Sequence, residues 1–224
     1  MKQITVIGGG KGGVGKSMVS MCMLDMLKEQ GTKKLIYIET DDSNADVYKA
    51  VNETVTSHVI NLDTESGYLL MGEVIEREKP DNVVINTAAR ATESLIKHSG
   101  LLNDLATEMK MQLVMAWAMN RQRDGLELLK TFLDNKTGYD AIYAVKNLYF
   151  GSPEKFMRYD NSKLKERVNQ TLELPELNDL LADKLVDERL PLWADTSKMQ
   201  IMQRSALNKF RLMATENLKP IIKG

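Results

Sequence analysis

The chain has 224 residues, with 30 Lys and Arg against 31 Asp and Glu, so its formal net charge at pH 7 is −1. This length is sufficient for one large α/β domain with a full hydrophobic core, and we expect residues 1–224 to form a single domain. A nearly balanced charge gives no general attraction to polyanions, so nucleic-acid binding would need a local basic patch. The only cysteine, Cys22, excludes an internal disulfide framework and any CxxC metal or redox site.

The first residues carry no secretion signal, because a strand-like run begins at residue 4 without a basic segment and an apolar core before it. The sequence also lacks a run of about 18 apolar residues, the length that a membrane-spanning helix requires. We therefore expect a cytoplasmic protein.

Short β-branched runs alternate with segments of helical periodicity along the chain. Strands are expected at residues 3–8, 34–39, 58–62, 82–87, 112–118 and 141–146. Helices are expected at residues 17–29, 66–78, 92–109, 122–134, 161–169, 177–187 and 197–217. The alternation predicts a doubly wound α/β fold with a mostly parallel sheet and helices on both faces. Ligands of such sheets bind at the carboxyl ends of the strands.

The loop after the first expected strand reads GKGGVGKS at residues 10–17, which satisfies the P-loop pattern GxxxxGK[ST]. Glycines allow successive N–H groups to surround a phosphate, and the following helix N-terminus adds partial positive charge. In this pattern Lys16 neutralises the β- and γ-phosphates and Ser17 coordinates Mg²⁺. Nucleotide contacts are expected from Gly10, Lys11, Gly12, Gly13, Val14, Gly15, Lys16, Ser17 and Met18.

The string KGGVGKS, residues 11–17, resembles the deviant Walker A motif of the ParA/MinD family of P-loop ATPases. The resemblance implies that ATP or ADP and Mg²⁺ are bound, and that two copies form a homodimer in the ATP state. In that family the early lysine, here Lys11, reaches the phosphates bound by the partner subunit. A cation supplied by the partner makes dimerisation and triphosphate binding mutually dependent. Lys11 and Lys16 are thus expected to be catalytic.

The second expected strand ends in Glu39-Thr40-Asp41-Asp42. Family members carry a D-x-D-type motif here, so Glu39 matches the first acid and Asp41 the second. The resemblance implies that Asp41 is catalytic and binds Mg²⁺ through water, close to the attacking water. Asp42 stands where the family often has proline. The alternative is an N-cap cluster in which Ser43 or Asn44 starts a helix; this stretch also looks like the matching segment of TraL-type ATPases of conjugative plasmids.

The strand that should carry the Walker B acid reads Val83-Val84-Ile85-Asn86, so Asn86 takes the position of the aspartate. Its amide oxygen can accept a hydrogen bond from Mg²⁺-bound water, but the negative charge is lost. Three explanations stay open. Asp41 supports slow hydrolysis, the chain is a non-hydrolysing ATP-gated scaffold, or the sequence carries an engineered Asp→Asn change that traps the ATP state.

Asn147 ends the sixth expected strand, where the family commonly places an amide that pairs with adenine; the alternative is a turn residue. The closing helical segment, about residues 197–224, is basic. From residue 198 onward its charged residues are Lys198, Arg204, Lys209, Arg211, Lys219 and Lys223 against Glu216. This excess indicates nonspecific DNA binding, as in ParA proteins, or a solvated helix, with a MinD-like membrane-surface helix less favoured.

These observations predict an ATPase that switches by dimerisation in plasmid partition or conjugative DNA transfer, with slow hydrolysis and an unidentified protein partner or cargo. The scaffold and a membrane-surface positioning ATPase are the alternatives. A small-molecule ligase or kinase would not need Lys11.

Overall fold

The computed structural model describes residues 2–10, 12–43 and 45–223, with side chains described up to residue 222. Its centre is one seven-stranded sheet in which each described pair of neighbouring strands is parallel, in the order β3-β2-β4-β1-β5-β6-β7. The strands are β1 (Gln3–Gly9), β2 (Leu35–Glu39), β3 (Thr56–Val59), β4 (Asn82–Asn86), β5 (Gln112–Met119), β6 (Ala141–Asn147) and β7 (Gln170–Leu174). The central strands are buried along their whole length, as expected for a parallel sheet covered on both sides.

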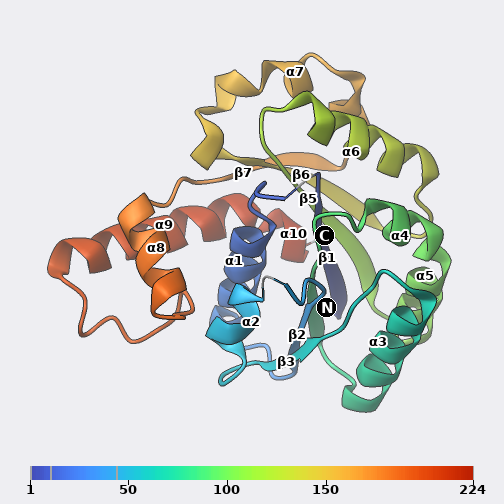
Figure 1. Ribbon diagram of the computed structural model, residues 1–224, viewed down its shortest axis with the longest axis horizontal. Helices are drawn as coiled ribbons and strands as arrows, with labels where there is room; N and C mark the ends of the chain where they lie inside the picture. The colour runs from blue at the N-terminus through green and yellow to red at the C-terminus, as the bar shows by residue number, and fades with distance from the viewer. Residues whose placement is uncertain (1, 11, 44, 224) are drawn as a thin grey trace.

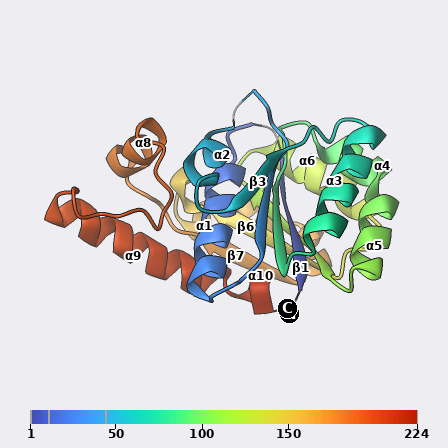
Figure 2. The ribbon, with the colours of Figure 1, turned by 90° about the horizontal axis from the view of Figure 1, so that it is seen from below.

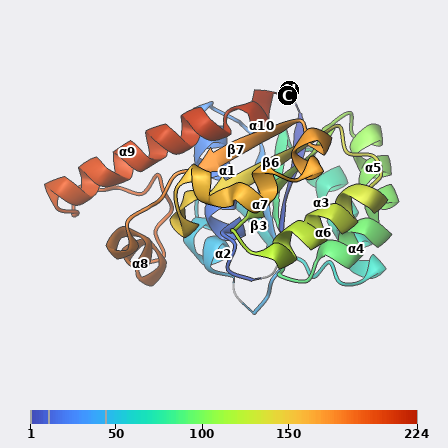
Figure 3. The same ribbon diagram turned by 90° about the horizontal axis from the view of Figure 1, so that it is seen from above.

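Helices cover both faces of the sheet (Figure 1). One face carries α1 (Lys16–Glu29), α2 (Asp46–Val51), α8 (Asp179–Asp187), α9 (Ile201–Leu218) and α10 (Pro220–Lys223). The other carries α3 (Glu65–Glu78), α4 (Thr92–Lys97), α5 (Ser99–Glu108), α6 (Arg123–Asn135) and α7 (Met157–Asp160). Short 3-10 turns η1 (Leu148–Phe150), η2 (Pro153–Phe156) and η3 (Lys163–Arg167) precede β7. Figures 2 and 3 show the same layers from below and above. The predicted doubly wound α/β fold is confirmed.

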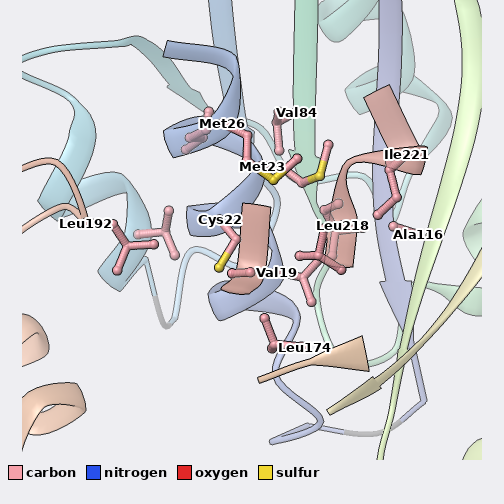
Figure 4. Close-up of a cluster of buried hydrophobic side chains, with 14 of the residues drawn as sticks. Val19, Cys22, Met23, Met26, Val84, Ala116, Leu174, Leu192, Leu218 and Ile221 are labelled. Atoms are coloured by element: carbon pink, nitrogen blue, oxygen red, sulfur yellow. The ribbon is translucent and has the colours of Figure 1, made fainter. Parts of the chain in front are cut away.

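Each face has its own hydrophobic core. On the first face, Val19, Cys22 and Met23 of α1 pack with Leu218 and Ile221 from the C-terminal helices (Figure 4). On the second face, the core includes side chains of α3, α5 and α6. Burying two faces explains why the strands read as continuous apolar runs instead of alternating ones.

Three sequence predictions are wrong in detail. The strand expected at 58–62 forms as β3 at 56–59. The α-helix expected at 161–169 is not formed, because η3 occupies residues 163–167 and the edge strand β7 follows. The helix expected at 92–109 is divided into α4 and α5. At this break the hydroxyl of Ser99 donates to the carbonyl of Ile96 at 2.8 Å, a local bond that competes with helix continuation.

The strand register brings three loops together at the carboxyl edge of the sheet. Asn86 of β4 pairs with Ile7 of β1 on one side and with Glu39 of β2 on the other. The loops that follow these strands therefore start side by side. No helix within the described residues is long and apolar enough to cross a membrane.

Candidate functional site

The loop between β1 and α1 has the backbone of a phosphate cradle. Gly13 and Gly15 adopt left-handed φ values of 77° and 99°, which side chains other than glycine rarely tolerate. A Cβ on Gly15 would lie 2.2 Å from Nδ2 of Asn147, so this position has no room for a side chain. Gly12 and Gly13 are exposed at the rim of the loop, while Val14 is buried beneath it. The loop therefore opens to solvent and is packed tightly on its inner side.

Lys16 begins α1 and is 8 % exposed. Burial lowers the pKa of its ammonium, and the carboxylates of Asp41 and Glu39 oppose that decrease. Among the described residues, none forms a hydrogen bond or ion pair with the Lys16 ammonium. A buried cation at the start of a helix, next to a glycine-rich loop, fits an anionic ligand. This is the feature of the site that best matches a nucleotide phosphate.

The Glu39 carboxylate is fully buried and accepts hydrogen bonds from several donors. Nδ2 of Asn86 donates to both of its oxygens at 3.1 and 3.0 Å, and the hydroxyl of Tyr37 donates to one of them. The N–H groups of Thr40 and Asp41 donate at 3.0 and 3.2 Å. Burial raises the pKa of the Glu39 carboxyl, whereas these hydrogen bonds oppose the rise. A group that only accepts has the hydrogen bonding of an ionised carboxylate.

The amide at position 86 is integrated into this network. Its oxygen accepts from the hydroxyl of Ser20 at 3.1 Å while its nitrogen donates to Glu39. A carboxylate at position 86 could not donate to Glu39 and would place a second negative charge against it. The negative charge missing from β4 is thus present one strand away, on Glu39.

Asp41 lies half-buried beyond the end of β2. Its carboxylate accepts from the N–H of Ser43 at 3.2 Å and from the Ser43 hydroxyl at 2.5 Å. Ser43 therefore does not cap α2, whose N-cap is Ala45 and has no side-chain cap bond. Asn44, the other residue named for that cap, is outside the described residues, as is Lys11. The neighbouring turns are joined by the N–H of Ala88, which donates to the Thr40 hydroxyl at 2.8 Å.

Asn147 contacts the phosphate loop directly. Its Nδ2 donates to the carbonyl of Val14 at 3.1 Å, and its oxygen accepts from the N–H of Tyr149 at 3.1 Å. The residue is 6 % exposed. Asn147 therefore holds the buried inner side of the phosphate loop in place, a positioning role that the sequence did not indicate. Its pairing with adenine stays a prediction.

A cavity of about 550 Å³ adjoins the loop and is lined by Gly12, Ala89 and Arg90 together with residues of α4 and α6. Arg90 was missed because no sequence pattern distinguishes a cation four residues after Asn86. The described residues contain no group of three His, Cys, Asp or Glu that could hold a metal. Ser17, exposed at the start of α1, and Asp41 fit Mg²⁺, an ion that keeps several waters and takes ligands from bound phosphates.

The basic closing segment is joined to α1 by ion pairs, so not all of its positive charge is available to a partner. Arg211 donates to both carboxylate oxygens of Asp25 at 2.8 and 2.7 Å and to Glu29 at 2.8 Å, so it is occupied within the chain. The membrane-surface alternative depends on four apolar side chains near one face of this segment, of which Phe210, Ala214 and Leu218 are buried and Met213 is 43 % exposed.

Solved structures share this fold across nearly the whole chain. The cell division ATPase MinD of Pyrococcus furiosus aligns with a TM-score of 0.56 and 16% identity, over 98% of this chain and 99% of that protein. MinD of Pyrococcus horikoshii, complexed with Mg-ADP, gives 0.54 and 18%, over 96% of each chain. A nucleotide-binding protein of Archaeoglobus fulgidus in complex with ADP gives 0.53 and 16%, over 84% of this chain and 86% of that one.

The chain therefore has the fold of the MinD structures, and its first loop carries a P-loop motif. No family model matches the chain. Protein MobD of Acidithiobacillus ferrooxidans is 38% identical over 226 residues, which cover 99% of this chain and 98% of that protein. The chain belongs to the family of MobD.

Proposed function

We propose that this chain is an ATP-dependent molecular switch that binds Mg·ATP at residues 10–18 and forms a homodimer in that state. The observation that carries the proposal is the buried Lys16 ammonium, which has no bonded partner among the described residues and stands in an open glycine cradle. Phosphate oxygens would replace the lost solvation of this cation. Lys11 would then contact the nucleotide of the partner subunit.

Hydrolysis in this proposal is slow and uses Asp41. Its carboxylate lies close enough to Lys16 to affect the ammonium pKa, and the Ser43 bonds hold it in place. Glu39 is surrounded by donors and buried, so it orients the site through Asn86 and Lys16 without reaching the water. The work of the switch is plasmid partition or conjugative DNA transfer, with nonspecific DNA contacts through the exposed cations of the closing segment and a protein partner. Its place is the cytoplasm.

The test is steady-state hydrolysis of ATP with Mg²⁺, with and without duplex DNA. Lys16→Ala supplies the background rate. Asp41→Asn keeps the shape and the hydrogen-bond acceptor, and the exposed neighbour Asp42→Asn is the matched control. We expect turnover above background that Asp41→Asn removes and Asp42→Asn retains.

A second candidate is an ATP-gated scaffold that does not hydrolyse, and it is favoured by the missing charge at Asn86. It predicts tight ATP binding and dimerisation with no turnover in the parent chain. Equal turnover in the parent and in Lys16→Ala, together with ATP binding that Lys16→Ala removes, would select the scaffold.

A further inference from the structure

An apolar groove of about 740 Å³ is lined by residues of α3 and α5. Figure 1 shows these two helices on the side of the sheet opposite α1, the helix that follows the phosphate loop. Buried Tyr68, Met71 and Leu102 form its floor. Leu69 and Leu101 stand at its edge and are 55 % and 37 % exposed. Contiguous apolar surface of this kind, bordered by polar side chains, is typical of an interaction site.

The border of this groove is acidic. Glu73 and Glu76 line it from α3, and Asp104 and Glu108 line it from α5. Against these exposed carboxylates it has one cation, Lys79. Within the described part of the chain none of the four carboxylates belongs to an ion pair. The groove therefore fits an apolar helix that also carries positive charge.

The N-terminal half of α9 has these properties. Ile201 and Met202 in this half are 73 % and 79 % exposed, and Leu212 in the turn that follows is 69 % exposed, which is unusual for side chains of this size. Arg204 and Lys209 lie among them, and residues 196–215 contain no Asp or Glu. Figures 1 and 2 show this half of α9 projecting beyond the sheet, at the opposite end of the molecule from α3 and α5.

We propose that α9 of one copy docks in the α3–α5 groove of a second copy. The two surfaces lie too far apart to meet within one chain, so the contact joins different copies head to tail and extends into open assemblies. It is separate from the proposed nucleotide-dependent homodimer and needs no nucleotide. It uses the same α9 cations that a DNA contact would use, so the two contacts exclude each other.

The test is sedimentation velocity of the nucleotide-free full chain over a range of concentrations, at low and high salt. We expect association that salt weakens. Glu73→Lys/Glu76→Lys and Arg204→Glu/Lys209→Glu should each weaken it about tenfold or more, because like charges then face each other. An equimolar mixture of the two variants should associate again. The basic groove of one variant can then bind the acidic α9 of the other, and the acidic groove of the second can bind the basic α9 of the first.

The control for the groove variant is Glu53→Lys/Glu166→Lys, which changes net charge by the same amount at exposed sites elsewhere and should associate like the parent. A parent chain that stays monomeric at low salt overturns the proposal. So does a loss of association in the groove variant alone, because the groove would then bind something other than α9. Since nucleotide is absent, neither result depends on the ATP-driven dimer.

Discussion

At the scale of single residues, the contact between Asn86 and Glu39 determines how the site is charged. Replacing Asn86 with Asp removes the donor that faces Glu39 and adds a second buried carboxylate at hydrogen-bond distance. We expect Asn86→Asp to destabilise the fold by about 3 kcal/mol at neutral pH, a typical value for an uncompensated buried charge. Urea unfolding of both chains measures this difference.

The pH dependence of this loss has a definite sign. Glu39 already has a raised pKa in the folded chain, and an adjacent carboxylate would raise the pair further above its unfolded values. The destabilisation is therefore complete above the folded pKa and decreases as pH falls through it, when one carboxyl takes a proton. The double variant Glu39→Gln/Asn86→Asp exchanges donor and acceptor and should recover most of the stability. An Asn86→Asp chain as stable as the parent would contradict this account.

Because Lys16 is expected to bind phosphate as an ammonium, the affinity for nucleotide should depend on pH in the alkaline range. Burial lowers the pKa of the free Lys16 ammonium below its ordinary value, and bound phosphate would raise it again, so binding takes up a proton. Affinity for Mg·ATP should stay constant near neutral pH and decrease as pH rises through the lowered pKa. Lys16→Ala should bind about a hundredfold more weakly and lose this dependence, since charged hydrogen bonds contribute about 1.5–3 kcal/mol each. Calorimetric titration at several pH values measures both effects, and an affinity that increases with pH would refute them.

At the scale of elements, the ion pair between Arg211 and Asp25 fastens α9 to α1. Asp25 is almost fully buried, so Arg211→Ala leaves an uncompensated charge and should lower stability by about 2 kcal/mol or more. Burial and the Asp25 charge raise the pKa of the neighbouring Cys22 thiol, which should therefore resist alkylation in the native parent chain. Arg211→Ala should alkylate faster as α9 opens. Equal alkylation rates in parent and variant would show that α9 does not depend on this pair.

The helices and the central strands could be predicted from sequence because their periodicity reflects direct burial. The strand β1, the helix α1 and the loop between them are local, and their pattern is specific. The edge strand β7 was missed because it is only five residues long and because its pairing with β6 is a non-local contact that has no local sequence signal. The break at Ser99 was missed because one side-chain bond decides it.

At the scale of the whole molecule, the site combines residues that only the sheet brings together. Lys16 and Ser17 were recognisable from their spacing, and Asp41 from a resemblance. The pairing of Glu39 with Asn86 depends on the register of β2 against β4, and the support of the loop by Asn147 spans 133 positions of the chain. Neither contact has a local sequence signal. The sequence therefore indicated a nucleotide ligand, whereas the contacts that position the residues around it became visible only in the fold.

The most direct test of the proposed switch is the mass of the full chain in solution with and without Mg·ATP, measured by light scattering at a salt concentration that suppresses the proposed contact between α9 and the α3–α5 groove. We predict a change from 25.3 kDa to about twice that mass when Mg·ATP is added. Lys16→Ala should bind Mg·ATP about a hundredfold more weakly and stay monomeric at nucleotide concentrations that saturate the parent, whereas Lys11→Ala should bind nucleotide and still stay monomeric. A parent chain that binds Mg·ATP without any change in mass, or a Lys11→Ala chain that dimerises normally, would contradict it.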